Sequence, residues 1–176
     1  MRPDPRQDFV EYVTARLPHL RRTAYLLCGD RHRAEDVVQD TTIALYTKWQ
    51  LAQAAVNTDG YVHWMLVRQY LRQQRLAWSR VLLSDRTAER AAPSSGSVEE
   101  RDRVSTALAQ VGRRQRAGVV LRYFCDLSVS ETATVLGCSE GTVKSQAARA
   151  LTTLRGLLAD PDHVTASRST KGSTRE

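Results

Sequence analysis

The sequence has 176 residues, with 26 lysines and arginines against 19 aspartates and glutamates, and a formal net charge of +7. This length suits one ordinary domain or two small ones, and the basic balance points to an acidic partner such as nucleic acid, with a generally basic surface as the alternative. The sequence lacks an apolar run long enough to span a membrane and an apolar signal core at its N-terminus, which predicts a cytoplasmic protein with no membrane partner.

The first predicted helix covers about residues 7–28. Its apolar residues recur at spacings of three and four, which puts them on one face. Pro18 lies inside this stretch and predicts a kink or a break, because proline removes a backbone donor from a helix. Gly29 and Asp30 then supply a helix stop and a new N-cap. The apolar face comprises Phe9, Val13, Leu17, Leu20, Ala24 and Leu27.

The second predicted helix, about residues 31–50, carries an acidic face in a chain that is basic as a whole. Asp36, Gln39 and Asp40 lie at i, i+3 and i+4 and therefore cluster on one side. This cluster favours a charged protein interface, with a solvated helix face as the alternative. A catalytic role is disfavoured, because no nucleophile, metal-ligand set or glycine-rich phosphate loop accompanies the two carboxylates.

The third predicted helix, about residues 61–79, has a basic face. At 100° per residue, Arg68, Arg72 and Arg75 share one narrow sector, and Trp64 lies at its edge. Basic residues beside an exposed aromatic ring suit single-stranded or opened DNA, because bases stack while phosphates are neutralised. The alternative is that Trp64 belongs to the core and the arginines are solvated. The predicted core residues on the opposite side are Val62, Leu66, Tyr70 and Ala77.

The composition shifts after the third helix. Proline, glycine and serine gather in residues 81–101, which predicts a flexible linker between a first domain, residues 7–80, and a second, residues 102–158. Residues 159–176 have almost no apolar content and are predicted to be disordered. The patterning is helical throughout, so we expect an all-α fold of two small helical domains.

The second domain contains the signature of a helix-turn-helix. Ser128 and Glu131 form a capping box that starts one helix, and Gly137 ends it where a positive φ is needed. Ser139 can cap the next helix, and Val143 is predicted to fill the angle between the two helices. A two-helix unit with so tight a turn is typical of DNA-binding proteins.

The outer face of the last helix predicts contact with duplex DNA. It carries small, polar and basic residues, which suit entry into the major groove. Lys144 and Arg149 can reach phosphates or guanine edges, and Glu140 can accept from a cytosine amino group. The alternative is a helical hairpin packed inside a larger core. The face comprises Glu140, Lys144, Ser145, Ala148, Arg149 and Thr152.

Cysteines and histidines show no metal or disulfide pattern in the sequence. Cys28, Cys125 and Cys138 form no CxxC pair, and their odd number argues against a disulfide framework. His19 and His63 lie at no recognisable ligand spacing, and the same is true of His32. We therefore expect no metal, no cofactor and no catalytic residue, and ordinary structural roles at these positions.

These motifs together resemble a known family, the extracytoplasmic-function (ECF) group of sigma-70 transcription initiation factors, and within it the SigE-like group. Residues 34–41, from Ala34 to Thr41, resemble its core-binding segment, with Gly29-Asp30 before them and Tyr46 and Trp49 after them. In the second half, residues 114–117, 121–124, 127–133 and 141–145 resemble its −35-reading domain. The resemblance covers about residues 8–156, in the family's order.

The resemblance implies a sigma factor that directs core RNA polymerase to promoters, with no catalysis of its own. The second domain would be a helix-turn-helix of the winged-helix-like or sigma region 4 type, and the first would be sigma region 2. Asp36, Gln39 and Asp40 would dock on the clamp helices of the polymerase β′ subunit. Trp64, Arg68, Arg72 and Arg75 would read and help to open the −10 element. The −35 contacts would come from Ser139, Glu140, Gly141, Thr142, Lys144, Ser145 and Arg149. Family members are often held inactive by an anti-sigma factor, which makes one a possible partner.

Other functions remain as alternatives. A stand-alone helix-turn-helix regulator with an N-terminal sensing or dimerisation domain needs only the second half, and has no need of the acidic face around Asp36. A divergent sigma-like protein that opens promoters poorly is suggested by Arg68 and Gln73, which stand where the subgroup commonly carries other residues. An enzyme acting on nucleic acid finds no support in the spacing of nucleophiles or ligands.

Overall fold

The computed structural model describes residues 5–83 and 99–159, and within them every regular element is helical. The predicted linker and tail fall largely on 84–98 and 160–176, outside the described residues. The first group of helices comprises α1 (Pro5–Cys28), α2 (Arg31–Thr47), α3 (Trp49–Ala54) and α4 (Thr58–Leu83). The second comprises α5 (Glu99–Gln110), α6 (Arg113–Val119), the π-helical turn η1 (Val120–Phe124), α7 (Val129–Leu136) and α8 (Glu140–Ala159). Among the described residues, every helix is too short or too polar to cross a lipid bilayer.

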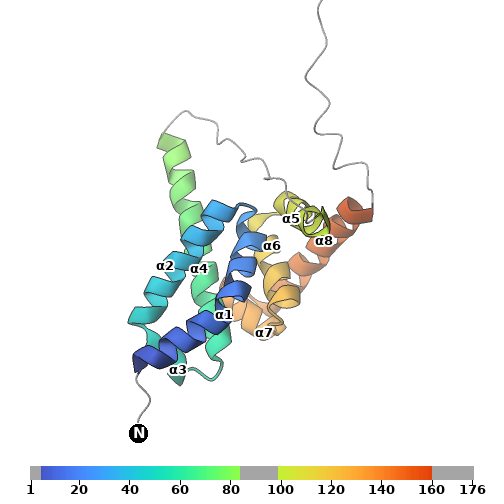
Figure 1. The fold of residues 1–176 in the computed structure, drawn as a ribbon. Helices are drawn as coiled ribbons and strands as arrows, with labels where there is room; N and C mark the ends of the chain where they lie inside the picture. The colour runs from blue at the N-terminus through green and yellow to red at the C-terminus, as the bar shows by residue number, and fades with distance from the viewer. Residues whose placement is uncertain (1–4, 84–98, 160–176) are drawn as a thin grey trace, which may run out of the picture.

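Figure 1 shows the two groups lying side by side, with α1 next to the second group. Helix α1 touches α5, α6 and η1, and α4 touches α7. The buried apolar side chains of both groups form one continuous cluster. The all-α prediction is confirmed, and the two helical groups share a common core in this arrangement.

The first group differs from the sequence prediction in three places. Helix α4 runs from Thr58 to Leu83, where the prediction gave about residues 61–79, so it takes in the first residues of the predicted linker. Helix α1 passes through Pro18 without a break, since the buried Leu20, Ala24 and Leu27 that follow hold the second half of the helix on the core. Helix α2 ends at Thr47, where the prediction continued to residue 50. Lys48 leaves the helical region with φ −117° and ψ 19°, and α3 then begins at Trp49.

The end of α2 is explained by the packing of Trp49. Its ring is buried and lies 5.5 Å from the ring of Phe9 and 5.1 Å from that of Tyr12, both on α1. A straight continuation of α2 would carry Trp49 past these partners. Aromatic pairs of this kind contribute about 0.5–1.5 kcal/mol beyond the area that they bury. This contact offsets the lost backbone hydrogen bonds of the broken helix.

The predicted start of α2 is confirmed. Gly29 has φ +69° and ends α1, and the side chain of Asp30 accepts a hydrogen bond from the backbone N–H of Arg33 at 2.8 Å. The side of α2 that faces α1 and α4 is buried. Its buried members are Ala34, Val37, Val38, Thr41 and Leu45.

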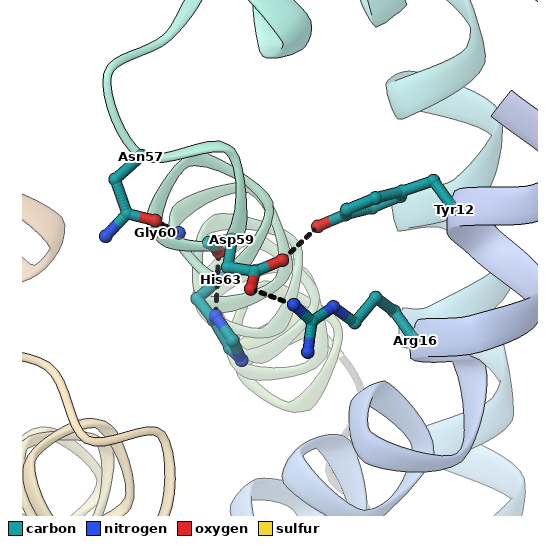
Figure 2. A network of polar contacts seen from close by, with 6 residues as sticks. All are labelled: Tyr12, Arg16, Asn57, Asp59, Gly60 and His63. Carbon is teal, nitrogen blue, oxygen red and sulfur yellow. Dashed lines mark hydrogen bonds and ion pairs between the residues drawn. The ribbon is translucent and has the colours of Figure 1, made fainter. Parts of the chain in front are cut away.

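The N-terminus of α4 is tied to α1 by polar contacts, drawn in Figure 2. The side chain of Asn57 caps the helix by accepting from the N–H of Gly60 at 2.8 Å. Asp59 accepts from the hydroxyl of Tyr12 at 2.7 Å and forms an ion pair with Arg16. These contacts fix how α4 leans on α1, and therefore where the exposed face of α4 points.

The two groups of helices are joined by a buried cation. Arg116 of α6 is 8% exposed, and its Nη1 donates to the carbonyl of Leu27, near the end of α1, at 2.8 Å. A guanidinium at the C-terminal end of a helix is stabilised by the helix dipole. Arg116 therefore acts as a polar tie between the two halves.

Further contacts between the halves lie around η1. Phe124 stacks on His19 of α1, with ring centroids 4.9 Å apart, and the Cys125 sulfur is 3.7 Å from the hydroxyl oxygen of Thr23. On α4, the ring of His63 lies 5.4 Å from that of His19. Burial lowers the pKa of both histidines, which keeps their rings neutral near pH 7.

Candidate nucleic-acid and protein interfaces

The acidic face predicted on α2 is accessible. Asp36 and Gln39 are exposed, while Asp40 is half-buried. The side-chain amide of Gln73, on α4, donates to the Asp40 carboxylate at 3.2 Å. The opposite side of α2 is buried against α1 and α4, so the helix holds the three side chains on a firm support. The geometry therefore offers a rigid, negatively charged surface to a partner.

The basic face predicted on α4 is also accessible. Arg68, Arg72 and Arg75 are exposed, and Trp64 is half-buried. The guanidinium carbon of Arg68 lies 4.9 Å from the centre of the Trp64 ring, which is a cation–π contact. The Trp64 ring touches the core and also reaches the surface, and its role in DNA binding stays a prediction. The predicted opposite side is buried at Val62, Leu66 and Tyr70.

Tyr61 extends the aromatic surface of α4 and was not singled out from the sequence. Its ring lies 5.5 Å from that of Trp64, and it is half-buried. The two residues are three positions apart on one helix, a spacing that brings side chains together. The spacing of three was therefore the feature of the sequence from which this aromatic pair could have been predicted. The pair presents two rings beside three arginines.

The helix-turn-helix predicted in the second half is present as α7 and α8. The hydroxyl of Ser128 accepts from the N–H of Glu131 at 3.1 Å, and the Glu131 carboxylate accepts from the N–H of Ser128 at 2.7 Å. The second of these bonds is the main cause that holds the pKa of Glu131 below its usual range. Gly137 has φ +63° and ends α7. The side chain of Ser139 accepts from the N–H of Thr142 at 3.2 Å and caps α8.

We expect Ser128→Ala to lower the free energy of unfolding by about 1 kcal/mol, since the helix loses one side of its capping box. The change is measured as a shift in the denaturant midpoint, with Ser130→Ala as the control. Ser130 lies in the same turn, is exposed and caps nothing in the structure. Equal midpoints for the two variants would contradict the role assigned to the box.

The outer face of α8 is open to solvent. Val143, Ala147, Ala150 and Leu154 are buried against the rest of the second half. The predicted contact residues on the other side are exposed, except for Thr142, which is half-buried. The exposed members are Ser139, Glu140, Gly141, Lys144, Ser145 and Arg149. No part of the described chain covers this face, which leaves α8 free to enter a groove.

One cluster of potential metal ligands is found among the described residues. One ligand atom each of His19, His63 and Cys125 lies within 4.8 Å of the other two. The three residues come from α1, α4 and the turn after η1, so they are too far apart in the sequence to form a recognisable metal-binding motif. Only the contact between the two halves brings them together. Cys28 and Cys138 are free and half-buried.

Family models match both halves of the chain. Residues 12–80 match the model described as "Sigma-70 region 2", and residues 101–154 match the model described as "Sigma-70, region 4". The first match contains the exposed faces of α2 and α4, and the second contains α7 and α8. The two matches follow each other in the order that the sequence motifs indicated.

Individual proteins are similar along most of the chain. The RNA polymerase sigma-E factor of Streptomyces coelicolor is 32% identical over 161 residues, which cover 88% of each chain. The ECF RNA polymerase sigma factor SigL of Mycobacterium tuberculosis is 31% identical over 145 residues, 77% of this chain and 80% of that one. Among solved structures, the sigma factor RpoE of Bartonella quintana, in complex with the anti-sigma factor NepR, has a TM-score of 0.74 and 28% identity. That match covers 88% of this chain and 99% of the other.

Proposed function

The chain belongs to the ECF group of the sigma-70 family, and from this membership we propose a division of promoter recognition among its helices. As a sigma factor it directs core RNA polymerase to promoters. In our proposal, α2 docks on the polymerase, α4 binds and helps to open the −10 element, and α8 reads the −35 element. Accordingly, residues 7–80 and 102–158 would act as separate recognition domains joined by residues 81–101.

The role proposed for α2 rests on its charge and its support. Asp36 and Gln39 are exposed, and Asp40 lies beside them on a helix whose other side is buried. An acidic surface on a chain of net charge +7 suits a basic protein surface, and it is repelled by DNA. The proposed partner is the pair of clamp helices of the β′ subunit.

The role proposed for α4 rests on the combination of rings and arginines. Opened DNA presents unstacked bases together with phosphates, so a surface that binds it needs both kinds of group. Trp64 offers a face for stacking, and Arg68, Arg72 and Arg75 are exposed along the same helix. The free energy for opening would then come from binding the separated strand, with no nucleotide hydrolysis. We accordingly propose that the protein is not an enzyme.

The role proposed for α8 rests on its free outer face. In a helix-turn-helix the second helix enters the major groove and its N-terminal residues approach the base edges. Gly141, Lys144 and Ser145 lie in the first two turns of α8 and are exposed. Small residues there let the backbone approach the DNA closely, and Lys144 supplies a positive charge.

The observation that carries the whole proposal is the coexistence of these three exposed faces in one chain of two matched regions. Run-off transcription with purified core polymerase tests it directly. A promoter is first recovered by selecting DNA from a random pool with core polymerase and this protein. Transcription from that promoter should require the protein, and scrambling of either the −10 or the −35 block should abolish it. Transcription that continues without the protein would refute the proposal.

We expect Trp64→Ala to weaken binding of the holoenzyme to a promoter with a pre-opened −10 region by roughly 5- to 150-fold, because base–aromatic stacking contributes about 1–3 kcal/mol per base. The measurement is a competition assay on bubble and fully paired templates. Trp64→Phe is the control, since it keeps a ring for stacking. Equal binding by the alanine and phenylalanine variants would argue that the ring serves only the core.

Two further properties follow from the proposed function. RNA polymerase and the chromosome are cytoplasmic, so we propose that the protein works there. We also propose an anti-sigma factor as a regulatory partner, because the similar RpoE of Bartonella quintana was solved in complex with the anti-sigma factor NepR. Co-purification of this chain with such a partner from its own organism tests the second proposal, and purification of the free protein under all growth conditions would speak against it.

A further inference from the structure

A cavity of about 390 Å³ lies between the two halves of the molecule, and His19, His63 and Cys125 all line it. His19 belongs to α1, His63 to α4, and Cys125 follows directly on the π-helical turn η1. The ligand atoms of the three lie within 4.8 Å of one another. Two imidazoles and one thiol around a shared space are a ligand set typical of zinc.

His63 is oriented as a metal-binding histidine. Its Nδ1 lies 2.7 Å from the backbone carbonyl oxygen of Asp59, a contact that requires Nδ1 to carry the proton and donate. The other ring nitrogen, Nε2, is therefore left with a free lone pair. Figure 2 shows Nε2 on the far side of the ring, pointing away from the polar contacts around Asp59. A ring that donates one N–H to a carbonyl and offers the other nitrogen is the usual arrangement in metal sites.

The Nε2 atom of His63 has no hydrogen-bond partner among residues 5–83 and 99–159. The residue is 6% exposed, and this nitrogen is buried without a hydrogen bond. A buried polar atom that lacks a partner costs roughly 1–3 kcal/mol. Proteins rarely keep such an atom without a use for it. Its position beside another imidazole and a thiol indicates that the missing partner is a cation.

The other two side chains are held close to the His63 ring. The His19 ring is half-buried between Phe124, on which it stacks at 4.9 Å, and His63 at 5.4 Å. The Cys125 sulfur is free of any disulfide and lies 3.7 Å from the hydroxyl oxygen of Thr23. Arg16 of α1 lines the same cavity and is paired with Asp59, which reduces its repulsion of a metal ion.

We propose that His19, His63 and Cys125 form a Zn²⁺ site that joins the two halves of the protein. In tetrahedral zinc sites the nitrogens are about 3.4 Å apart and nitrogen and sulfur about 3.6 Å, so the three side chains need to draw together by at most about 1 Å. Ring rotation and a small movement of the turn after η1 accomplish this. The Cys125 thiol gives up its proton to solvent on binding, and water fills the fourth position.

The consequence for promoter binding rests on the proposed function. A packed chain of 176 residues is roughly 40 Å across. The −10 and −35 elements are about 25 base pairs apart, which at 3.4 Å per base pair is roughly 85 Å of duplex. The halves must therefore separate before α4 and α8 can reach both elements. A zinc ion bound by residues of both halves stabilises the packed form and opposes this separation, so the metal would inhibit transcription.

The first test is metal binding by the full-length protein alone, after treatment with a chelator. Co²⁺ serves as the probe, because a thiolate ligand gives a charge-transfer band and tetrahedral nitrogen and sulfur ligands give visible d–d bands. We expect one Co²⁺ per chain, displacement by Zn²⁺, and a rise in Tm of about 5–10 °C at a hundredfold excess of Zn²⁺ over its Kd. Absence of saturable one-to-one binding would overturn the proposal.

Matched variants identify the ligands. Cys125→Ser and His19→Gln should each weaken binding by more than about 100-fold, because the loss of outer partners alone costs 10- to 100-fold. Cys138→Ser and His32→Gln are the controls, as these residues lie outside the cluster. If His63→Gln fails to fold, Cys125→Ser still tests whether this cluster binds the metal. A charge-transfer band that persists in Cys125→Ser would refute the site.

The regulatory consequence is tested separately, so that its failure is distinct from failure of the proposed function. In run-off transcription, Zn²⁺ should lower the yield with the wild type and with Cys138→Ser, and leave the yield with Cys125→Ser unchanged. Equal inhibition of all three proteins would show that Zn²⁺ does not inhibit transcription through this site. If the protein alone bound the metal but did not bind core polymerase, the proposed function would be refuted and the metal site would stand.

Discussion

An Asp36→Arg/Asp40→Arg variant should bind core RNA polymerase at least roughly 30-fold more weakly than the wild type. Loss of one partner from a buried, hydrogen-bonded charge pair costs about 2–5 kcal/mol, and reversal adds repulsion from the basic surface that the carboxylates met. The measurement is a titration of labelled protein with core polymerase at low salt, where screening is least.

The physical reason for so large an effect is the support beneath the two carboxylates. Val37, Val38 and Leu45 are buried on the opposite side of α2, so the helix cannot roll to hide a reversed charge. Asp40 is further held by the Gln73 amide at 3.2 Å, which reduces the entropy that the side chain loses on docking. A rigid surface transmits a change of charge directly to its partner.

The control for this variant is Asp8→Arg/Glu11→Arg, which makes the same change of charge on α1. It should bind core polymerase within about twofold of the wild type, since its charges lie outside the proposed interface and exposed charges contribute little. The single variant Asp36→Arg leaves the Asp40–Gln73 bond intact and should show most of the loss. Equal binding by the two double variants would exclude α2 as the docking helix.

Much of the fold follows from local chemistry in the sequence. Asp30, Ser128 and Ser139 each accept a backbone hydrogen bond at the start of a helix, as their type and position predicted. Gly29 and Gly137 take positive φ where the helices end. The buried faces of α2, α4 and α8 follow the period of 3.6, because burial of an apolar stripe is what holds each helix in place.

The features of the fold that could not be predicted depend on contacts between residues that are distant in the sequence. Pro18 stays inside α1 because packing of the following turn outweighs its cost, and Trp49 breaks α2 because its ring partners lie on α1. Neither balance is visible in a local pattern. The π-helical turn before Cys125 is likewise set by tertiary structure, and it carries the residue that faces His19 and His63.

The exposed faces of the candidate sites could likewise be predicted from local sequence, whereas the metal-ligand cluster could not. Asp36, Arg72 and Lys144 are exposed as expected, because a polar residue opposite an apolar stripe can only face outward. The roles given to them in binding remain predictions. The cluster of His19, His63 and Cys125 had no signal at all, since it forms only where the two halves meet.

On the DNA side, we expect Lys144→Ala/Arg149→Ala to weaken holoenzyme binding to a selected promoter by roughly 10- to 1,000-fold at moderate salt. Each residue that contacts a base edge contributes about 1–3 kcal/mol of discrimination, and each phosphate contact is lost together with its released counterion. The side chains of both residues are exposed on α8, on the side away from the buried Val143 and Ala147. Binding is measured by competition with the wild-type holoenzyme over a range of salt concentrations.

The control is Arg155→Ala, which removes one positive charge from the same helix. Arg155 is exposed but lies in the last two turns of α8, beyond the residues expected to enter the groove. It should change affinity by less than about threefold, while Lys144→Ala and Arg149→Ala should each exceed that. Equal losses for all three variants would mean that α8 contributes only a diffuse positive potential.

Salt dependence then separates the two kinds of contact that Lys144 and Arg149 can make. Removal of a residue that contacts phosphate makes the plot of log K against log salt less steep by about 0.9. The removal also weakens binding to the selected promoter and to one with a scrambled −35 block by the same factor. A residue bound to a base edge weakens the selected promoter alone. We expect the second behaviour from at least one of the two, because α8 exposes Gly141 and Ser145 beside them and such small residues allow the helix to lie deep in the groove. If both residues behaved as phosphate contacts, the reading of the −35 element would have to come from other residues of α8 or from the shape of the DNA.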